Sequence, residues 1–168
     1  MTVDDLERRF DYNYWANKRL LFVVARLTPD EFTRTVAGSY GSIRNTLVHM
    51  MSAEWGWIDR CGGPSRPAQL RADDYPTLQS VIEQWAVVEG YAREFVGTLT
   101  DADLDRIVEF TLGLTGKQAM ALGELLQHAT THGVHHRGQV ALLLRMLGHA
   151  PGNFDLLFYD AEKRAAGV

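Results

Sequence analysis

The sequence predicts an all-α protein, a four-helix bundle that holds a metal site in its core. One observation is the placement of the five prolines, which leaves the long segments between them free of proline, as helix interiors require. The other is the stretch "HATTHGVHHRGQ", residues 128–139, in which His128, His132 and His136 follow one another at intervals of four. Helical bundles bind metals through side chains on facing helices, so the two observations agree on one architecture.

Cap residues and prolines delimit four long amphipathic helices. We expect the first over residues 3–27, capped by Thr2 and followed by a short capped turn at "TPDEF". The second begins after Ser42 and ends before "CGGP", the third runs from about 77 to 99, and the fourth from about 118 to 148. Long helices joined by connections of mixed length are typical of a bundle.

The remaining segments are expected to be additions to a single domain, residues 1–168. At 168 residues and 46% hydrophobic, the chain suits one compact core. Residues 62–76 predict a long loop, and residues 106–117 alternate around glycines, which predicts a small hairpin-like excursion. The tail "NFDLLFYDAEKR" carries an apolar patch that should pack back on the bundle.

Composition excludes several classes of protein. The net charge is −4 with both signs interspersed, so there is no basic patch for nucleic acid. No apolar run approaches the roughly 20 residues of a membrane span, and the N-terminus lacks the pattern of a signal peptide. Cys61 is the only cysteine, which excludes an intramolecular disulfide and fits a reducing compartment. We therefore expect a cytoplasmic protein without nucleic-acid or membrane partners.

The histidine spacing predicts a chelating site. Residues four apart lie on one helical face, so either the pair His128/His132 or the pair His132/His136 can bind one metal ion. A catalytic zinc usually takes three protein ligands and leaves one position open. The third ligand must come from another helix, and His49, in the middle of the second helix, is a better candidate than His149 in an expected loop.

Other polar residues occupy positions where apolar residues are expected. Glu54 lies within the apolar stripe of the second helix, and Asn13 and Asn17 lie within that of the first. A buried glutamate is costly without a partner, so Glu54 could act as a general base or as a hydrogen-bond acceptor for a metal ligand. It could equally be a carboxylate that reaches solvent or an arginine at the bundle edge.

Four stretches of the sequence resemble one known family. They are "YNYWANKRLL", "SIRNTLVHMMSAEWGW", "LLQHATTHGVHHRGQV" and the ending "PGNFDLLFYD", and they resemble the signature stretches of DinB-like proteins. The resemblance implies a four-helix bundle with a divalent metal held by three histidines, one in the second helix and two in the fourth. The matching positions are His49, His132 and His136, and His128 then becomes a neighbour of the site.

The resemblance also implies a class of chemistry. Related proteins include transferases and isomerases that depend on a small thiol such as mycothiol or bacillithiol, and homodimers are common among them. We expect a metal-dependent enzyme that uses such a thiol on a small-molecule substrate. The alternatives are a metal-dependent hydrolase and a stress-response protein that binds a metal or ligand without catalysis.

The sequence also predicts which metal binds and how the chain assembles. Neutral imidazoles suit Zn²⁺, which is the expected metal, and Ni²⁺ and Fe²⁺ are the other candidates. Apolar surface on the first helix and on the aromatic tail exceeds what a lone bundle buries, which favours a homodimer.

Overall fold

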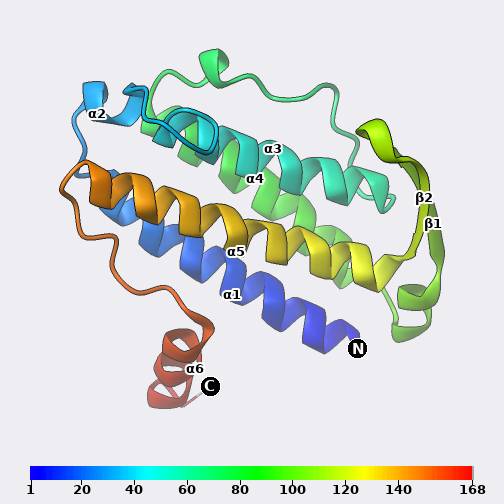
Figure 1. Ribbon diagram of the computed structural model, residues 1–168. Coiled ribbons are helices and arrows are strands. Elements are labelled where there is room, and N and C mark those ends of the chain that lie inside the picture. The colour runs from blue at the N-terminus through cyan, green and yellow to red at the C-terminus, as the bar shows by residue number, and fades with distance from the viewer. Residues whose placement is uncertain (168) are drawn as a thin grey trace.

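Four long helices form the body of the protein. The computed structural model describes residues 1–167, and the long helices are α1 (Val3–Val24), α3 (Ile43–Arg60), α4 (Leu78–Gly97) and α5 (Leu122–Met146). Helices α1 and α3 each pack against both α4 and α5, so the four elements enclose a common interior (Figure 1). The predicted all-α fold, with a cluster of histidines between its helices, is confirmed.

Side-chain caps begin three of these helices as the sequence predicts. Thr2, Ser42 and Thr77 each accept a hydrogen bond from the backbone N–H three residues later. The short α2 (Pro29–Thr33) is capped in the same way by Thr28 and has proline at its first position. The cap residues therefore explain why these four helices begin where they do.

A β-hairpin precedes α5. Strands β1 (Ile107–Leu112) and β2 (Gly116–Ala121) pair antiparallel around a short 3₁₀ turn, Gly113–Thr115, and Ala121 leads directly into α5. The predicted start of the last long helix at residue 118 is therefore wrong, because residues 118–121 pair with β1 instead of entering the helix. The hairpin itself is the expected excursion, extended by four residues.

The loops and the tail complete the fold. Residues 62–76 form the expected long loop, with one 3₁₀ turn at Ala72–Asp74, and a second 3₁₀ turn spans Asp101–Asp105. The tail forms α6 (Leu156–Ala165), which packs on α1 through the buried Tyr159. Its other apolar residues stay exposed, with Leu157 at 69% exposure. Val168, the last residue of the predicted domain, lies outside the described residues.

The interior has two apolar halves with polar residues between them. One cluster gathers around Leu47 and Leu144, and the other gathers around Phe10 and Leu126. Midway along α1, α3 and α5, the buried side chains are polar instead: Asn13, Asn17, Glu54 and Arg137. None of the helices in residues 1–167 has the length and apolarity to cross a membrane.

Candidate metal centre

Three histidines from two helices converge on one point. The Nε2 atom of His132 lies 3.4 Å from Nε2 of His49 and 3.1 Å from Nε2 of His136. Nitrogen ligands about 2.0–2.1 Å from a tetrahedral zinc are themselves roughly 3.3–3.4 Å apart. These two separations are close to the spacing that a shared zinc ion requires, and the three ligand atoms all lie within 4.8 Å of one another.

The helix packing determines which histidines meet. His132 and His136 are four residues apart on α5, and the antiparallel α3 brings His49 against both of them. His128 instead packs edge-on against Trp57, with the ring centres 4.6 Å apart. His149 lies 3.1 Å from a carboxylate oxygen of Glu31. Among the described residues, the group able to hold an ion is therefore His49, His132 and His136.

The environment keeps these imidazoles uncharged. Burial, together with the neighbouring His136, lowers the pKa of His49 to about 4. Burial and the adjacent histidines lower the pKa of His132 to about 3, and burial also lowers the pKa of His136. Neutral imidazole is the form that binds a metal, so the site is in its ligating state at neutral pH.

Gln139 orients His136. The Nδ1 atom of His136 lies 2.6 Å from Oε1 of Gln139, which accepts a hydrogen bond from Nδ1–H and leaves Nε2 of the imidazole with a free lone pair. The same Gln139 oxygen accepts a hydrogen bond from the Ser39 hydroxyl at 2.7 Å. The loop before α3 thus supports the ring orientation that directs Nε2 toward the other histidines.

Tyr40 covers the cluster, and sequence reasoning did not find it. Its ring stacks on His49 with the ring centres 3.9 Å apart, and its hydroxyl oxygen lies 2.9 Å from His49 Nε2. Tyr40 belongs to the loop before α3, so neither helical periodicity nor histidine spacing could reveal the contact. Burial raises the pKa of the Tyr40 phenol, which therefore stays protonated at neutral pH.

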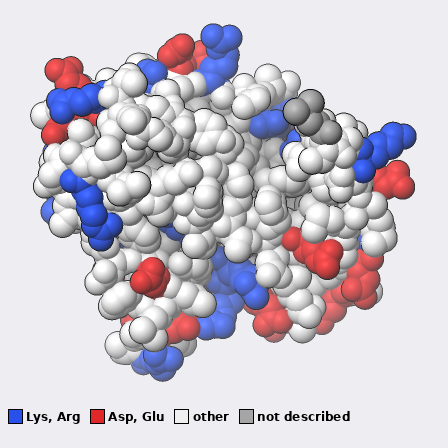
Figure 2. All heavy atoms as spheres, in the orientation of Figure 1, with Lys and Arg blue, Asp and Glu red and all other residues white. Residues whose placement is uncertain are grey.

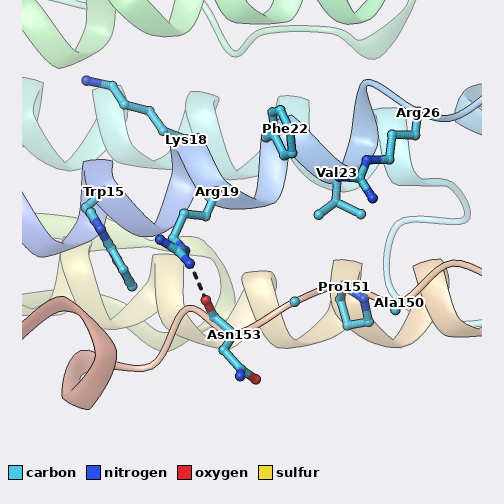
Figure 3. A pocket seen from close by; sticks show the side chains of 10 residues that line it. Trp15, Lys18, Arg19, Phe22, Val23, Arg26, Ala150, Pro151 and Asn153 are labelled. Atoms are coloured by element: carbon cyan, nitrogen blue, oxygen red, sulfur yellow. Dashed lines mark hydrogen bonds between the residues drawn. The ribbon is translucent and has the colours of Figure 1, made fainter. Parts of the chain in front are cut away.

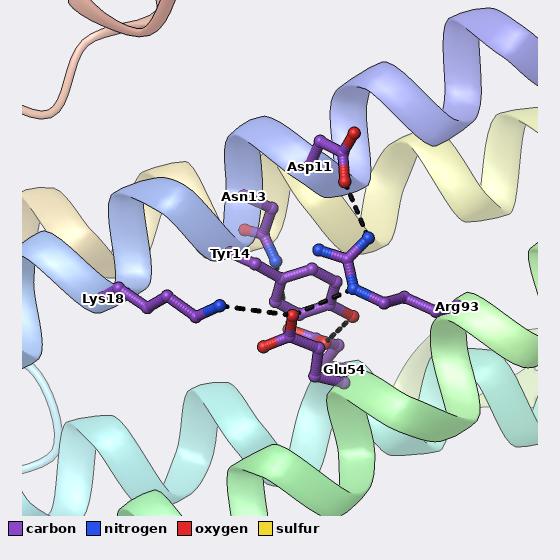
Figure 4. A network of polar contacts seen from close by, with 7 residues as sticks. Asp11, Asn13, Tyr14, Lys18, Glu54 and Arg93 are labelled. Atoms are coloured by element: carbon purple, nitrogen blue, oxygen red, sulfur yellow. Dashed lines mark hydrogen bonds and ion pairs between the residues drawn. The ribbon is translucent and has the colours of Figure 1, made fainter.

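Glu54 lies in a different environment, the polar interior of the bundle. Its two carboxylate oxygens accept hydrogen bonds from the Tyr14 hydroxyl at 2.7 Å and from the Asn13 amide at 3.2 Å (Figure 4). Trp85 also lies near the carboxylate, but its indole N–H does not close a regular hydrogen bond. Burial raises the pKa of Glu54, although the hydrogen bonds from these donors act to lower it. Glu54 is not one of the residues that converge with the three histidines.

Arg137 supplies the positive charge of this interior network. Its guanidinium Nη1 donates to Asn13 Oδ1 and to Asn17 Oδ1, and Arg137 also lowers the pKa of Glu54 through its charge. Gly133 makes room for the network, because a Cβ there would lie 2.6 Å from Asn13 Oδ1. The two asparagines and this helical glycine thus serve one buried cluster of hydrogen bonds.

The surface adds little chemistry elsewhere. A pocket of about 640 Å³ lies between α1 and residues 150–153, with Trp15, Phe22 and Pro151 along it and basic side chains at its edge (Figure 3). It contains no histidine, cysteine or carboxylate. The face that carries α3 and α5 is mostly uncharged at its centre, with both signs of charge around its edge (Figure 2). The histidine cluster is therefore the better candidate for function.

Fold and site together define a helical-bundle protein with a three-histidine group that could hold a metal ion. A sequence model of the DinB family matches residues 1–165, and the chain belongs to the DinB family.

Two curated relatives and one solved structure agree with that assignment. Protein DinB of Bacillus subtilis (strain 168) is 23% identical over 155 residues, which cover 89% of this chain and 90% of the relative. The uncharacterized protein YizA of the same organism is 27% identical over 142 residues, covering 84% and 87% of the two chains. The crystal structure of a DinB-like protein from Bacillus cereus ATCC 10987 superposes with a TM-score of 0.74 at 20% identity, over 90% of this chain and 97% of that one.

Proposed function

We propose that the protein is a metal-dependent enzyme that transfers or isomerises a substrate with the help of a low-molecular-weight thiol. His49, His132 and His136 would hold the divalent ion, most suitably Zn²⁺, with Ni²⁺ or Fe²⁺ as the other candidates. The observation that carries the proposal is the convergence of three imidazole Nε2 atoms at 3.1 and 3.4 Å with no carboxylate among them. A bound ion would lower the pKa of a thiol or polarise an electrophile.

The neutral ligand set supports this chemistry. Three imidazoles leave the full charge of a divalent ion uncompensated, which favours an anionic fourth ligand such as a thiolate. Lone pairs of neutral imidazoles repel one another at 3.1 Å unless a cation or a proton lies between them. The lowered pKa values of His49 and His132 keep both rings uncharged and therefore able to bind a metal ion.

The sulfur would come from outside the chain. Cys61 is the only cysteine, and it is buried in the apolar cluster around Phe10 and Leu126. Burial raises its pKa to about 12, which keeps it a thiol at neutral pH. A small cytoplasmic thiol is therefore the proposed nucleophile.

Tyr40 is the proposed proton donor and orienting group. Its protonated hydroxyl lies 2.9 Å from His49 Nε2, at the point where the three ligand atoms converge. From there it could donate a hydrogen bond to a heteroatom of the substrate. Tyr40→Phe keeps the stacking on His49 and removes only the hydroxyl, so it should retain metal and lose turnover.

Glu54 enters the proposal as a positioning residue. Its two oxygens accept hydrogen bonds from Tyr14 and Asn13 in the buried interior, and Glu54 is not among the residues that converge with the three histidines. Glu54→Gln should retain metal, because Glu54 is not one of the proposed metal ligands. Loss of turnover in that variant, with unchanged metal content and unchanged unfolding free energy, would instead support a general base.

The experiment is a conjugation assay on zinc-loaded protein with several small thiols and a generic electrophile. We expect thioether formation by the parent and about a hundredfold loss in His132→Ala, which removes the central imidazole. His128→Ala is the matched control, because it removes a histidine one turn earlier on α5 and should retain activity. Ester or amide hydrolysis without thiol would favour a hydrolase, and full zinc occupancy without any reaction would favour a binding protein.

We also propose that the protein forms a homodimer. Apolar side chains are exposed on α1 and on α6, including Phe22 at 67% and Leu157 at 69% exposure. A homodimer would cover such surface. Light scattering at micromolar concentration should give twice the chain mass, and a monomeric mass would contradict the prediction.

A further inference from the structure

Two arginines converge on Gly56, in the C-terminal half of α3, without a carboxylate to pair with. A Cβ on Gly56 would lie 3.0 Å from Cζ of Arg66 and 3.2 Å from Nη1 of Arg60, so both guanidinium groups approach the same buried glycine. Within residues 1–167, neither arginine forms an ion pair with an acidic side chain. Two like charges repel one another; solvent screens part of this repulsion at the exposed Arg60, and a bound anion would offset more of it.

The helix carbonyls satisfy only part of these guanidinium groups. Arg60 donates from Nη1 to the Gly56 carbonyl at 2.9 Å, and Arg66 donates from Nη1 to the Ser52 carbonyl and hydroxyl at 2.8 and 2.9 Å. The negative end of the α3 dipole stabilises both cations to some extent. A guanidinium carries five N–H donors, and the Nε and Nη2 groups of both arginines have no acceptor among the described residues.

The charge of Arg60 also acts on Arg66. Burial is the largest influence that lowers the pKa of its guanidinium, and the charge of Arg60 lowers it further. Asp59 acts in the opposite direction but forms no ion pair with either arginine within the described residues. Arg60 also stacks on Trp57, with Cζ 5.0 Å from the ring centre, which restrains its guanidinium near Gly56.

Arg60 lies on the same face of α3 as His49, and Arg66 reaches Gly56 on that face from the loop after the helix. Positions 49, 53, 56 and 60 follow the helical period, so His49, Ala53, Gly56 and Arg60 form one stripe. Ser52 and Gly56 follow His49 by three and seven residues, or about 4.5 and 10.5 Å along the axis. In this stripe, Ala53 lies between the histidine and the arginines and has only a small side chain.

We infer that Arg60 and Arg66 bind the anionic group of the substrate, a carboxylate or a phosphate, while its reactive end lies at the three histidines. The inference rests on the proposed function and names its substrate class, a small organic anion. Planar guanidinium groups bind both kinds of oxyanion through paired hydrogen bonds, and two of them can share one anion. The absent side chain of Gly56 lets both guanidinium groups lie close together over the helix, so one oxyanion could contact both of them.

The first experiment does not depend on the metal. Inorganic phosphate and succinate are titrated into metal-free protein while the side-chain Nε–H resonances of the arginines are followed by NMR. We expect saturable shifts at Arg60 and Arg66, and about a tenfold weaker apparent affinity in Arg66→Gln, which keeps a donor for Ser52 but removes the charge. Arg145→Gln, an exposed charge on α5, is the matched control and should bind as the parent does.

Gly56→Ala tests the geometry without changing charge. Its methyl group would displace both guanidinium groups, so we expect weaker anion binding with an unchanged far-UV circular dichroism spectrum. Equal affinities in the parent, Arg66→Gln and Gly56→Ala, or the absence of saturable shifts at these two arginines, would overturn the inference.

A second experiment links the two sites. Zinc-loaded protein is titrated by calorimetry with ω-mercapto carboxylic acids of increasing length and with the matching mercapto alcohols. One length of acid should bind about tenfold more tightly than its alcohol, and Arg66→Gln should remove that preference. If zinc does not bind, the proposed function fails while the phosphate titration still decides the anion site. If acids and alcohols bind equally, only the inference fails.

Discussion

Two neighbouring residues of α5, His136 and Arg137, belong to regions of opposite character. His136 joins a partly exposed group of three neutral imidazoles that contains no partner of opposite charge. Arg137 joins a buried network that contains a cation, a carboxylate and two amides, each bonded to another member. The difference teaches that the network finds most of its partners within the chain, with Arg137 Nη2 and Asn17 Nδ2 left without an acceptor among the described residues, whereas the histidine cluster contains no group of opposite charge.

The same difference separates stability from function. A buried network with its own charges contributes to a unique packing of the core, and removing one member leaves the others unsatisfied. A group of histidines with lowered pKa values costs stability only at low pH, and such perturbed groups are typical of functional sites. Variants in the buried network should therefore change the unfolding free energy, whereas variants in the histidine cluster should change the metal content and the pH dependence of stability.

The largest expected effect is on the network side. Arg137→Met should lower the unfolding free energy by about 3–5 kcal/mol, because Glu54 would remain buried without the cation and both asparagine oxygens would lose their donor. Urea denaturation measures the change. The double variant Arg137→Met with Glu54→Gln should recover part of the loss, and a single-variant cost below about 1 kcal/mol would show that the network is not a unit.

The two glycines inside α5 give a matched pair of intermediate effects. Gly133→Ala should destabilise by about 1–3 kcal/mol, because its methyl group would meet Asn13 Oδ1 at 2.6 Å and Arg137 Nη1 at 3.1 Å. The methyl group of Gly138→Ala would meet no atom within 4 Å, so this variant should stabilise the protein by up to about 1 kcal/mol through helix propensity. The same sign for both variants in thermal unfolding would contradict the account of Gly133.

The histidine side should respond to pH. The pKa of His49 is lowered to about 4 and that of His132 to about 3, whereas both take about 6.5 in the unfolded chain. The unfolded state then binds more protons, so the stability of metal-free protein is fully present above pH 6.5 and falls as the pH drops toward 3–4.

Denaturation at pH 7 and pH 5 measures this dependence. His132→Ala should reduce it, and Gly138→Ala, which changes no histidine, should leave it as in the parent. An equal pH dependence in His132→Ala and the parent would place the titrating groups elsewhere in the protein.

Local patterns predicted the fold well. Proline placement and the caps Thr2, Thr28, Ser42 and Thr77 were sufficient for the starts of four helices, because capping depends on residues three positions apart. The start of α5 was wrong because residues 118–121 pair with β1, a contact to a segment earlier in the chain. Helical periodicity cannot register such a pairing.

The site was predictable only where it follows helical spacing. The spacing brought His132 and His136 to one face but left the pair His128/His132 open. The resemblance to DinB-like proteins chose between the two pairs, and His128 packs on Trp57. Tyr40 and Ser39 reach the cluster from a loop, and Arg66 reaches α3 from another loop, so no periodic signal marks them. Glu54 was visible as a polar residue in an apolar stripe, but its partners on α1 were not.

The most direct test of the central claim is the metal content of purified protein, measured by elemental analysis after exposure to zinc and removal of excess. The account predicts about one zinc per chain in the parent and in His128→Ala, and a strong loss in each of His49→Ala, His132→Ala and His136→Ala. Full zinc content in His49→Ala, or a loss confined to His128→Ala, would contradict the ligand set. A parent protein that never holds a stoichiometric divalent ion would contradict the metal centre itself.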